Sequence, residues 1–399
     1  MNWGERISPA VRAIPPSGIR RFFDIVAETK GVVSLGVGEP DFVTPWHIRE
    51  SCVYGLQKGY TAYTSNYGLL ELREEIARHI NKKYGVPYDP RKEILVTVGV
   101  SEAVDLAMRA ILSPGDEVLV PEPCYVSYKA CVTLAGGKPV IVPTTLENEF
   151  RVTVAQLEQL VTPRTKAMLI GYPNNPTGAI LSWNELAAIA AFAEKHDLIV
   201  ISDEIYAEMT YHGEHTCFAS LPGMRDRTIL LNGFSKAYAM TGWRVGYALS
   251  NRDFINAMTK IHQYTMLCAP ITGQIAAIEA LKYGEGDVTK MVDEYNRRRR
   301  LMVEGIRRIG LPCFEPRGAF YIFPSVRETG LSSLAFAEQL LKAEKVALVP
   351  GEAFGASGEG FVRCSYASST TNLTEALERI DRFVNSSRAP KIRAVKSLK

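Results

Sequence analysis

Short apolar runs alternate with longer segments of helical periodicity between Glu93 and Ser250. Strands of a parallel sheet are covered by helices on both faces, so they are apolar along their whole length. The expected strands are residues 94–99, 117–121, 138–143, 166–172, 198–203, 228–231 and 245–249. The pattern predicts an α/β fold in which a mostly parallel, seven-stranded sheet lies between helices.

Helices are expected over residues 101–112 and 182–196, each of which opens with a serine. Ser182 is followed three residues later by Glu185, which is typical of a capping box at a helix N-terminus. Beyond the last expected strand the chain becomes helical, and residues 288–309 are expected to form a long helix.

From Pro312 onward the pattern changes to a mixture of short strands and helices. Strands are expected over residues 319–323 and 360–366, and helices over residues 333–344 and 372–385. This mixture predicts a second, smaller α+β domain after the large one.

Composition agrees with two domains and gives no indication of a nucleic-acid partner. The chain has 399 residues, 46% of them hydrophobic, which is enough for a large core. The net charge is only +3 and the isoelectric point about 8.3. The arginine run 297–300 is expected to form an exposed helix face, and the basic tail 388–399 a solvated chain end.

The seven cysteines are scattered, and none forms a C-x-x-C pair. An odd number without paired spacing favours reduced thiols and no cysteine-based zinc site, so no metal is expected. The start of the chain lacks the apolar core of a signal peptide, and no apolar stretch is long enough to span a membrane. A cytoplasmic protein without membrane contact is therefore expected.

Lys236 is the first candidate for chemistry. It follows the apolar run 228–231, with Ser235 before it and Arg244 after it. A lysine held in a dry position can form a Schiff base with a carbonyl cofactor, and a hydroxyl and a guanidinium can hold a phosphate. In a glycine-rich loop it can also be a surface residue or a point charge for phosphate.

Three more polar residues follow expected strands, at the edge where ligands bind in such sheets. Asp203 ends an apolar run, where a carboxylate needs a cation such as a protonated pyridine nitrogen, or serves as a helix N-cap. Tyr206 can bond a cofactor phenolate or simply pack. Asn175 lies in a turn rich in proline and can also orient a ring hydroxyl.

Three further features fit the binding of an anionic aromatic ligand. The segment 99–103 joins a strand to a helix N-terminus, where free N–H groups favour phosphate. Tyr125 can stack on an aromatic ring. Arg363 lies in the apolar run 360–366 and needs a carboxylate, either an internal one or that of a ligand.

Together these residues resemble one family, the class I/II aminotransferases of fold type I that depend on pyridoxal 5′-phosphate (PLP). The resemblance runs almost from end to end of the chain. The motifs that carry it are LGVGEPDF at 35–42, YTSNYG at 63–68, NPTG at 175–178, DEIY at 203–206, Ser235–Lys236, Arg244 and Arg363. Each motif is modest, but their order and spacing are specific.

The resemblance implies a role for each candidate residue toward PLP. Lys236 is then the Schiff-base lysine and the proton shuttle, and Asp203 pairs with the pyridinium nitrogen. Asn175 and Tyr206 hold the ring 3-oxygen, and Tyr125 stacks on the ring. The phosphate is held by Ser235, Arg244, Val100, Ser101 and Glu102.

The same resemblance implies the substrate contacts and the assembly. Arg363 grips the substrate α-carboxylate together with Asn175, and Gly38 lies beside it on a mobile N-terminal segment. Tyr63 reaches the phosphate of the neighbouring subunit, which implies a homodimer with shared active sites. The implied division is an N-terminal arm with part of the small domain (1–44), a large PLP-binding domain (45–285) and a C-terminal small domain (286–399).

The implied reaction moves an amino group from an L-amino acid to a 2-oxo acid such as 2-oxoglutarate by a ping-pong mechanism. The donor is aspartate, an aromatic amino acid or a broad range. Some aspartate-specific members carry a lysine where this chain has Ser101, which argues against strict aspartate specificity. Arg20 and Arg21 are candidates for a distal-carboxylate contact or for surface positions.

Two rival functions share this fold. A carbon–sulfur β-lyase would use the same lysine, although the motifs favour transamination. A non-catalytic regulator that binds the cofactor would need an added DNA-binding domain. The family-like region begins within the first ~35 residues and leaves no room for a helix-turn-helix module, so this alternative is disfavoured.

Overall fold

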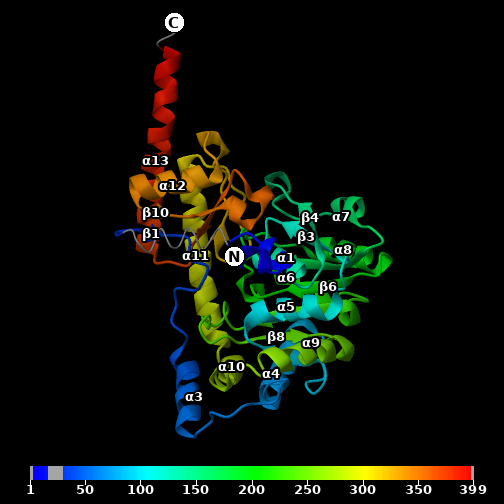
Figure 1. Cartoon of the computed structure of the whole chain (residues 1–399). Coiled ribbons are helices and arrows are strands. Elements are labelled where there is room, and N and C mark those ends of the chain that lie inside the picture. The colour runs from blue at the N-terminus through cyan, green and yellow to red at the C-terminus, as the bar shows by residue number, and fades with distance from the viewer. Residues whose placement is uncertain (1–2, 17–29, 397–399) are drawn as a thin grey trace.

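The structure is a computed structural model that describes residues 3–16 and 30–396 (Figure 1). The candidates Arg20 and Arg21 lie outside the described residues. The helices are α1 Pro9–Arg12, α3 Trp46–Gln57, α4 Leu70–Tyr84, α5 Gly99–Ile111, α6 Ser127–Leu134, α7 Val154–Leu160, α8 Trp183–Lys195, α9 Arg252–Thr265, α10 Ile271–Tyr283, α11 Glu285–Ile309, α12 Ser333–Glu344 and α13 Thr370–Lys396.

The expected seven-stranded sheet is confirmed. Its strands are β2 Ile94–Thr97, β3 Glu117–Glu122, β4 Lys138–Pro143, β5 Thr165–Gly171, β6 Ile199–Asp203, β7 Thr228–Gly233 and β8 Gly246–Leu249. The spatial order is β2-β8-β7-β6-β5-β3-β4. The neighbours from β7 to β4 are parallel, and β8 is antiparallel to both of its neighbours. Each expected strand is found within one or two residues of its predicted ends.

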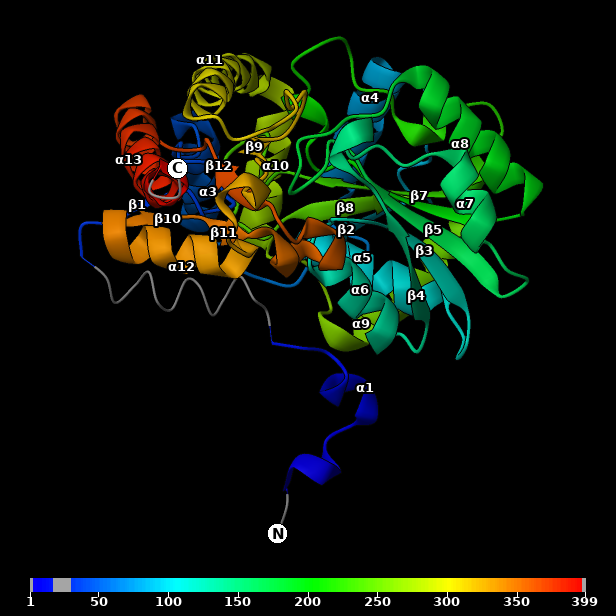
Figure 2. The same cartoon turned by 90° about the horizontal axis from the view of Figure 1, so that it is seen from above.

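Helices cover both faces of this sheet (Figure 2). One face packs on α5, α6 and α9 through a cluster that includes Leu95, Val120 and Ile229. The other face packs on α3, α4, α8 and α10, and Val96, Met168 and Val200 are among the strand residues in these contacts. Because both faces are buried, the central strands are near-continuous apolar runs, with charged residues such as Glu117, Glu122 and Lys138 at strand ends.

The C-terminal part has its own core, as expected for a second α+β unit. Its strands are β9 Tyr321–Ile322, β10 Val346–Ala347, β11 Val349–Pro350 and β12 Val362–Ser365. The N-terminal strand β1, Val33–Ser34, pairs with β10, so the start of the chain joins this part. We propose the domain division 1–44, 45–285 and 286–399, and this pairing supports it. Helix α13 runs to Lys396, further than the expected helix 372–385.

The expectation for the arginine run 297–300 is wrong at two positions. Arg298 is 8% exposed and Arg299 only 1%. Arg298 pairs with Asp41 at 2.8 Å and with Glu294 at 2.9 Å, and Arg299 pairs with Glu315 at 2.6 Å. Consecutive helical residues point about 100° apart, so a run of four faces both solvent and core. A buried guanidinium is tolerated there because carboxylates pair with it.

The two expected helix starts have different outcomes. Helix α8 is capped by Ser182, whose hydroxyl accepts from the N–H of Glu185 while the Glu185 carboxylate accepts from Ser182, as predicted. Helix α5 begins at Gly99 rather than at Ser101, and Val98 is its N-cap without a side-chain cap. Ser101 therefore lies inside the first turn.

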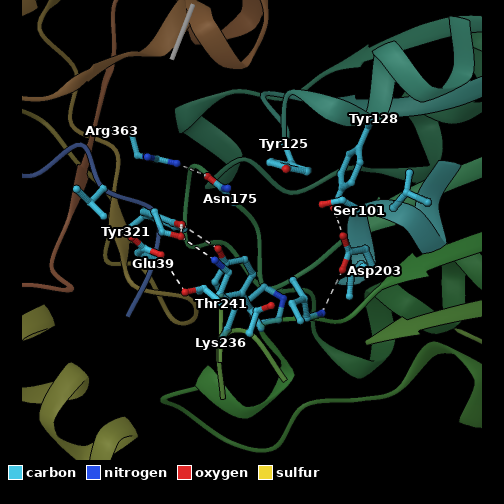
Figure 3. Close-up of a pocket in the computed structure, with 18 of the residues that line it drawn as sticks. Glu39, Ser101, Tyr125, Tyr128, Asn175, Asp203, Lys236, Thr241, Tyr321 and Arg363 are labelled. Carbon is cyan, nitrogen blue, oxygen red and sulfur yellow. Dashed lines mark hydrogen bonds between the residues drawn. The ribbon is translucent and has the colours of Figure 1, made fainter. Parts of the chain in front are cut away.

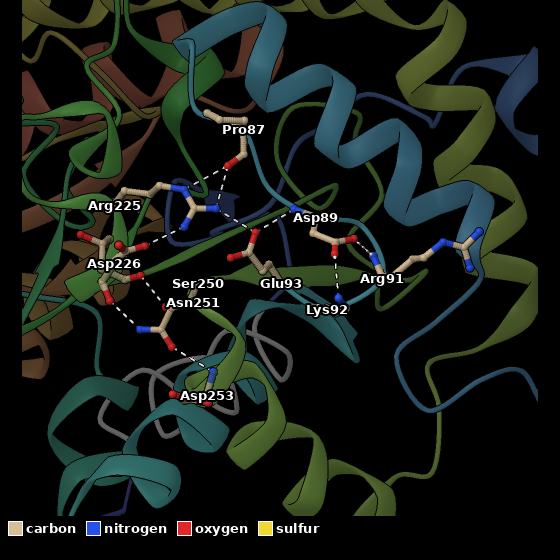
Figure 4. A network of polar contacts seen from close by, with 11 residues as sticks. Pro87, Asp89, Arg91, Lys92, Glu93, Arg225, Asp226, Ser250, Asn251 and Asp253 are labelled. Atoms are coloured by element: carbon tan, nitrogen blue, oxygen red, sulfur yellow. Dashed lines mark hydrogen bonds and ion pairs between the residues drawn. The ribbon is translucent and has the colours of Figure 1, made fainter.

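A polar network holds the edge of the sheet where β2 and β7 begin (Figure 4). Arg225 donates from Nη2 to the carbonyl of Pro87 at 2.9 Å and pairs with Glu93 at 2.8 Å. Asn251 donates to the carbonyl of Asp226 at 2.6 Å and caps α9. The network fixes the amino ends of the strands and leaves the carboxyl ends open.

All seven cysteines are free thiols, as the sequence predicts. Within residues 3–16 and 30–396, no helix is long and apolar enough to cross a membrane. The same part of the chain contains no group of three or more histidine, cysteine, aspartate or glutamate side chains arranged to hold a metal ion.

The capping box of α8 gives a stability test. Ser182→Ala should lower the free energy of unfolding by about 1 kcal/mol, because the N–H of Glu185 loses its acceptor. Ser182→Asp keeps an acceptor and is the matched control. The urea midpoints of the two variants and the parent provide the comparison, and equal midpoints for alanine and parent would show that the cap contributes nothing.

Candidate functional site

A cavity of about 650 Å³ lies at the carboxyl ends of the central strands (Figure 3). Figure 3 shows Arg363 and Asn175 toward one end of this cavity and Asp203 and Ser101 toward the other, with Lys236 between them. The predicted site residues that line it are Gly38, Val100, Ser101, Tyr125, Asn175, Asp203, Tyr206, Ser235, Lys236, Arg244 and Arg363. One cavity thus brings together residues from nearly the whole length of the chain.

Lys236 follows β7, and its amine points into the cavity. Its Nζ donates to the carbonyl of Gly38 at 2.7 Å and lies 5.9 Å from the ring centres of Tyr206 and Phe320. Burial lowers the pKa of Lys236 to about 8, and the positive charge of Arg363 acts in the same direction. A substantial fraction of this amine is therefore neutral near physiological pH, as a nucleophile or base requires.

Asp203 ends β6 and is 5% exposed. Its Oδ2 accepts from the hydroxyl of Tyr128 at 2.7 Å, and its Oδ1 accepts from the N–H of Ile205 at 3.1 Å. Burial raises the pKa of Asp203 to about 6, against the lowering effect of the Tyr128 bond. Among the described residues no lysine or arginine forms an ion pair with Asp203, so its carboxylate lacks a cation partner.

Tyr128 was not predicted, although the sequence offered a signal. It lies one helical turn after Tyr125, at the start of α6, and the two rings meet edge to face at 5.6 Å. Tyr125 precedes α6 and its N-cap Val126, and the N–H of Tyr128 donates to the carbonyl of Tyr125 at 3.1 Å, so a single turn brings the two rings together. Tyr128 positions Asp203, while Tyr125 lines the cavity.

Tyr321 is a second residue that the sequence analysis missed. Its hydroxyl lies 2.8 Å from the hydroxyl of Tyr206, and its ring lies 4.5 Å from the guanidinium of Arg363. Burial raises the pKa of Tyr206 well above its ordinary value, and the Tyr321 contact adds to this shift. Tyr206 therefore stays protonated and can donate a hydrogen bond. Tyr321 lies in the expected strand 319–323, and nothing in that apolar run marks it.

Arg363 is 3% exposed, yet its partners are neutral. Its Nη1 donates to Oδ1 of Asn175 at 3.0 Å, and its Nη2 donates to the carbonyl of Gly36 at 2.6 Å. Its Nε has no hydrogen-bond partner, and no carboxylate in the described part of the chain forms an ion pair with it. A buried cation without a counter-charge is costly, so the site favours an anionic ligand there.

The start of α5 has the features of an anion site. Arg244 donates to the carbonyls of Thr241 at 3.0 Å and of Val98 at 3.4 Å, which brings its guanidinium against the first turn of the helix. Gly99 has φ +76°, and a Cβ there would lie 2.6 Å from Nη2 of Arg244. A side chain at residue 99 would collide with the guanidinium, and side chains rarely adopt this positive φ, so glycine is favoured there. Ser235 lines the same cavity, so free N–H groups, a hydroxyl and a guanidinium gather there.

Two predicted site residues do not line the cavity. The side chain of Glu102 turns away and contacts the N–H of Val98 and the ring of His262. Tyr63 is 83% exposed and lies on the surface of this chain. The exposure of Tyr63 is compatible with a role toward a neighbouring subunit, and that role stays a prediction.

The functional groups around the cavity fit PLP. An anion site stands at the start of α5, a buried carboxylate without a cation at Asp203, and an amine with a lowered pKa at Lys236. These three groups match a phosphate, a ring nitrogen that carries a proton, and an aldehyde. Arg363, at the other end, leaves a place for the carboxylate of a second molecule.

Comparisons with known proteins agree with this reading of the cavity. Residues 30–380 match the family model described as aminotransferase class I and II. The chain is 56% identical to YugH of Bacillus subtilis, over 95% of this chain and 98% of that protein. It is 45% identical to aromatic-amino-acid aminotransferase 2 of Thermococcus litoralis, over 95% and 98% of the two chains.

A solved structure gives the same result in three dimensions. The crystal structure of aspartate aminotransferase from Thermotoga maritima superposes with a TM-score of 0.90 at 39% identity. The match covers 95% of this chain and 100% of that chain. A shared family model and near-complete coverage by named transaminases leave one assignment. The chain belongs to the class I and II aminotransferase family, and the protein is an amino-acid transaminase.

Proposed function

We propose that this protein transfers the amino group of an L-amino acid to a 2-oxo acid by a ping-pong mechanism with PLP as its cofactor. The observation that carries the proposal is Arg363, a buried guanidinium without a carboxylate partner among the described residues, in the same cavity as Lys236 and Asp203. The cavity thereby provides separate positions for a cofactor and for an amino-acid carboxylate.

The cofactor side of the proposal uses the inner end of the cavity. When bound, PLP supplies an aldehyde carbon for the amino group and a protonated ring that accepts electrons from the substrate α-carbon. Asp203 would face the ring nitrogen and keep it protonated, and Tyr128 would hold Asp203 in place. Tyr206 and Asn175 would donate to the ring 3-oxygen, with Tyr125 stacked on the ring.

The phosphate side uses the groups at the start of α5. The backbone N–H groups of Val100 and Ser101 would donate to the phosphate oxygens, together with the hydroxyl of Ser235 and the guanidinium of Arg244. These groups come from two segments, the first turn of α5 and the connection between β7 and β8, which meet at one place. Their role is to fix the cofactor, so that its ring keeps one orientation above Asp203.

Lys236 would bind the cofactor and then move the proton. Once a substrate amine had taken its place, the freed Nζ would be available to take the α-proton, because its pKa is about 8. The carbonyl of Gly38, which accepts from Nζ at 2.7 Å, gives the free amine a defined position. Lys236 would return the proton at the cofactor carbon, and water would then hydrolyse the bond between nitrogen and the substrate carbon, which would release the 2-oxo acid and leave the amino group on the cofactor.

The substrate would bind through its α-carboxylate to the fork of Arg363. The identity of its side chain is a finer point, and we propose aspartate, an aromatic amino acid or a broad range as donor, with 2-oxoglutarate as an acceptor. The relatives named as aspartate and as aromatic aminotransferases support this range. Ser101, in place of a lysine, favours a donor other than aspartate alone.

We also propose a homodimer with shared sites and a cytoplasmic location. Large apolar side chains are exposed on α3 and on the segments around it, among them Trp46, Tyr54 and Tyr264. Such a surface favours contact with a second copy, which would bring Tyr63 to the phosphate of the neighbouring site. The seven free cysteines support a reducing compartment.

Absorbance during addition of amino acids tests the reaction. The purified protein should show the visible band of lysine-bound cofactor, and a donor should convert it to the aminated cofactor with release of a 2-oxo acid. Lys236→Ala should keep its fold and lose both the band and turnover, because no amine remains to bind or to move the proton. Release of pyruvate and ammonia with the band regenerated would indicate a lyase instead, and normal turnover of Lys236→Ala would refute the role of this lysine.

The pKa of Lys236 predicts how cofactor uptake depends on pH. Only the neutral amine attacks an aldehyde, so the uptake rate of cofactor-free protein should rise roughly tenfold per pH unit below the pKa of about 8 and level off above it. Stopped-flow absorbance gives the midpoint. Arg363→Met removes a charge that lowers this pKa, so its midpoint should lie at higher pH. Identical midpoints for the two proteins would contradict this electrostatic coupling.

Mixed dimers test the shared site. Lys236→Ala and Tyr63→Ala chains should each have low activity, because each lacks one part of every site. In a hybrid dimer one site carries both changes and the other neither, so an equal mixture should recover roughly a quarter of the parent activity. Differently tagged chains show by mass spectrometry whether hybrids form. Hybrids without recovered activity would rule out a contribution of Tyr63 across the interface.

A further inference from the structure

We propose that the pair formed by Glu102 and the buried His262 positions the phosphate-binding turn of α5 and keeps the charge of Glu102 from opposing a bound phosphate. The inference rests on the proposed function, because it assigns a role toward the phosphate of PLP. It concerns two residues outside the cavity, neither of which would touch the cofactor with its side chain.

Glu102 holds the first peptide of the helix. Its carboxylate accepts from the N–H of Val98, the N-cap of α5, which lacks a side-chain cap of its own. The carbonyl of Val98 accepts from Nη2 of Arg244 at 3.4 Å, and the carbonyl of Gly99 accepts from Thr97 at 3.0 Å. Side chains thus fix the start of the helix on both its N–H and its C=O sides, and Glu102 supplies the N–H side.

His262 is directed at Glu102 alone. It comes from α9, is fully buried, and its Nδ1 lies 2.7 Å from Oε1 of Glu102. Because a carboxylate is only an acceptor, Nδ1 carries the proton and donates it. Its Nε2 has no hydrogen-bond partner in the described part of the chain. A buried imidazole nitrogen without a hydrogen-bond partner lowers the stability of the fold. The hydrogen bond to Glu102 is the polar interaction that offsets this loss and holds the ring in place.

The pair also resolves an electrostatic conflict. A carboxylate in the first turn is favourable for an isolated helix, because it faces the positive end of the dipole. A phosphate at the same helix end would compete with that carboxylate and be repelled by it. The hydrogen bond from His262 draws the carboxylate toward α9 and stabilises its charge there. Glu102 can then hold Val98 while the free N–H groups stay available to the phosphate.

The test compares PLP with pyridoxal, which lacks the phosphate but still reacts with Lys236. Dissociation constants of both are measured by absorbance on cofactor-free protein for the parent, His262→Leu, Glu102→Ala and the control Glu102→Gln. His262→Leu and Glu102→Ala should bind PLP roughly ten- to a hundredfold more weakly, as when outer hydrogen-bond partners of metal ligands are removed. Both should bind pyridoxal like the parent. Glu102→Gln keeps an acceptor for Val98 without the charge and should retain PLP affinity.

Each outcome decides one point. Unchanged PLP affinity in both His262→Leu and Glu102→Ala would overturn the inference, and so would an equal loss for PLP and pyridoxal, which indicates general damage to the site. If His262→Leu does not fold, the partly exposed position of Glu102 leaves Glu102→Ala as the deciding variant. A parent protein that binds neither compound at Lys236 would instead refute the proposed function, so the two failures are distinguishable.

Discussion

The parallel register of the sheet is the constraint on which the site depends. Gly171 of β5, Asp203 of β6 and Leu231 of β7 are register partners, so the loops after these three strands emerge at one edge. In the antiparallel strand β8, Ala248 pairs with Leu231, and Gly246 pairs with both Gly233 and Thr97, so the start of β8 lies at the same edge as the ends of β7 and β2. The loop after each strand then carries one functional group to the same place. Lysine, carboxylate and anion site meet because their strands end together.

The small domain and the N-terminal segment complete what the sheet edge leaves open. Arg363 lies in β12, and its guanidinium reaches across to Asn175 after β5 and to Gly36 near the start of the chain. Tyr321, on β9, links Arg363 to Tyr206. These contacts bridge the segments that the proposed division assigns to different domains. Positioning the carboxylate of a ligand at Arg363 would therefore draw on groups from all of these segments.

Sequence reasoning succeeded where one residue carries its own signal. Asp203 and Lys236 stand out because a charged residue at or shortly after the end of an apolar strand is costly without a partner. Tyr128 has only a weak signal, its spacing of three residues from Tyr125, and Tyr321 has none, since a buried tyrosine is ordinary and its hydroxyl partner is set by folding. The arginine run failed for a related reason: Arg298 and Arg299 are buried only because Asp41 and Glu315 reach them from distant parts of the chain. A single sequence carries little information about which side chains pair across long distances in the chain.

The ionisable groups of the cavity show what this arrangement costs the fold. The pKa of Asp203 is raised, so the folded state binds more protons than the unfolded state between about pH 4 and 6, and stability falls as pH rises through that window. The pKa of Lys236 is lowered, so stability rises with pH from about 8 toward its ordinary value. Between these windows both groups are held in the less favoured charged form.

That cost also explains why the site suits a ligand with matching charges. A cofactor that brings a cation to Asp203 and a covalent bond to the amine of Lys236, together with a substrate that brings an anion to Arg363, would offset the cost of all three groups. The same burial that destabilises these charged side chains makes each of these interactions stronger than it would be in water. The free energy of folding that is lost by burying these charged groups is thus available for binding. The register of the strands places the groups close enough together for cofactor and substrate to use it.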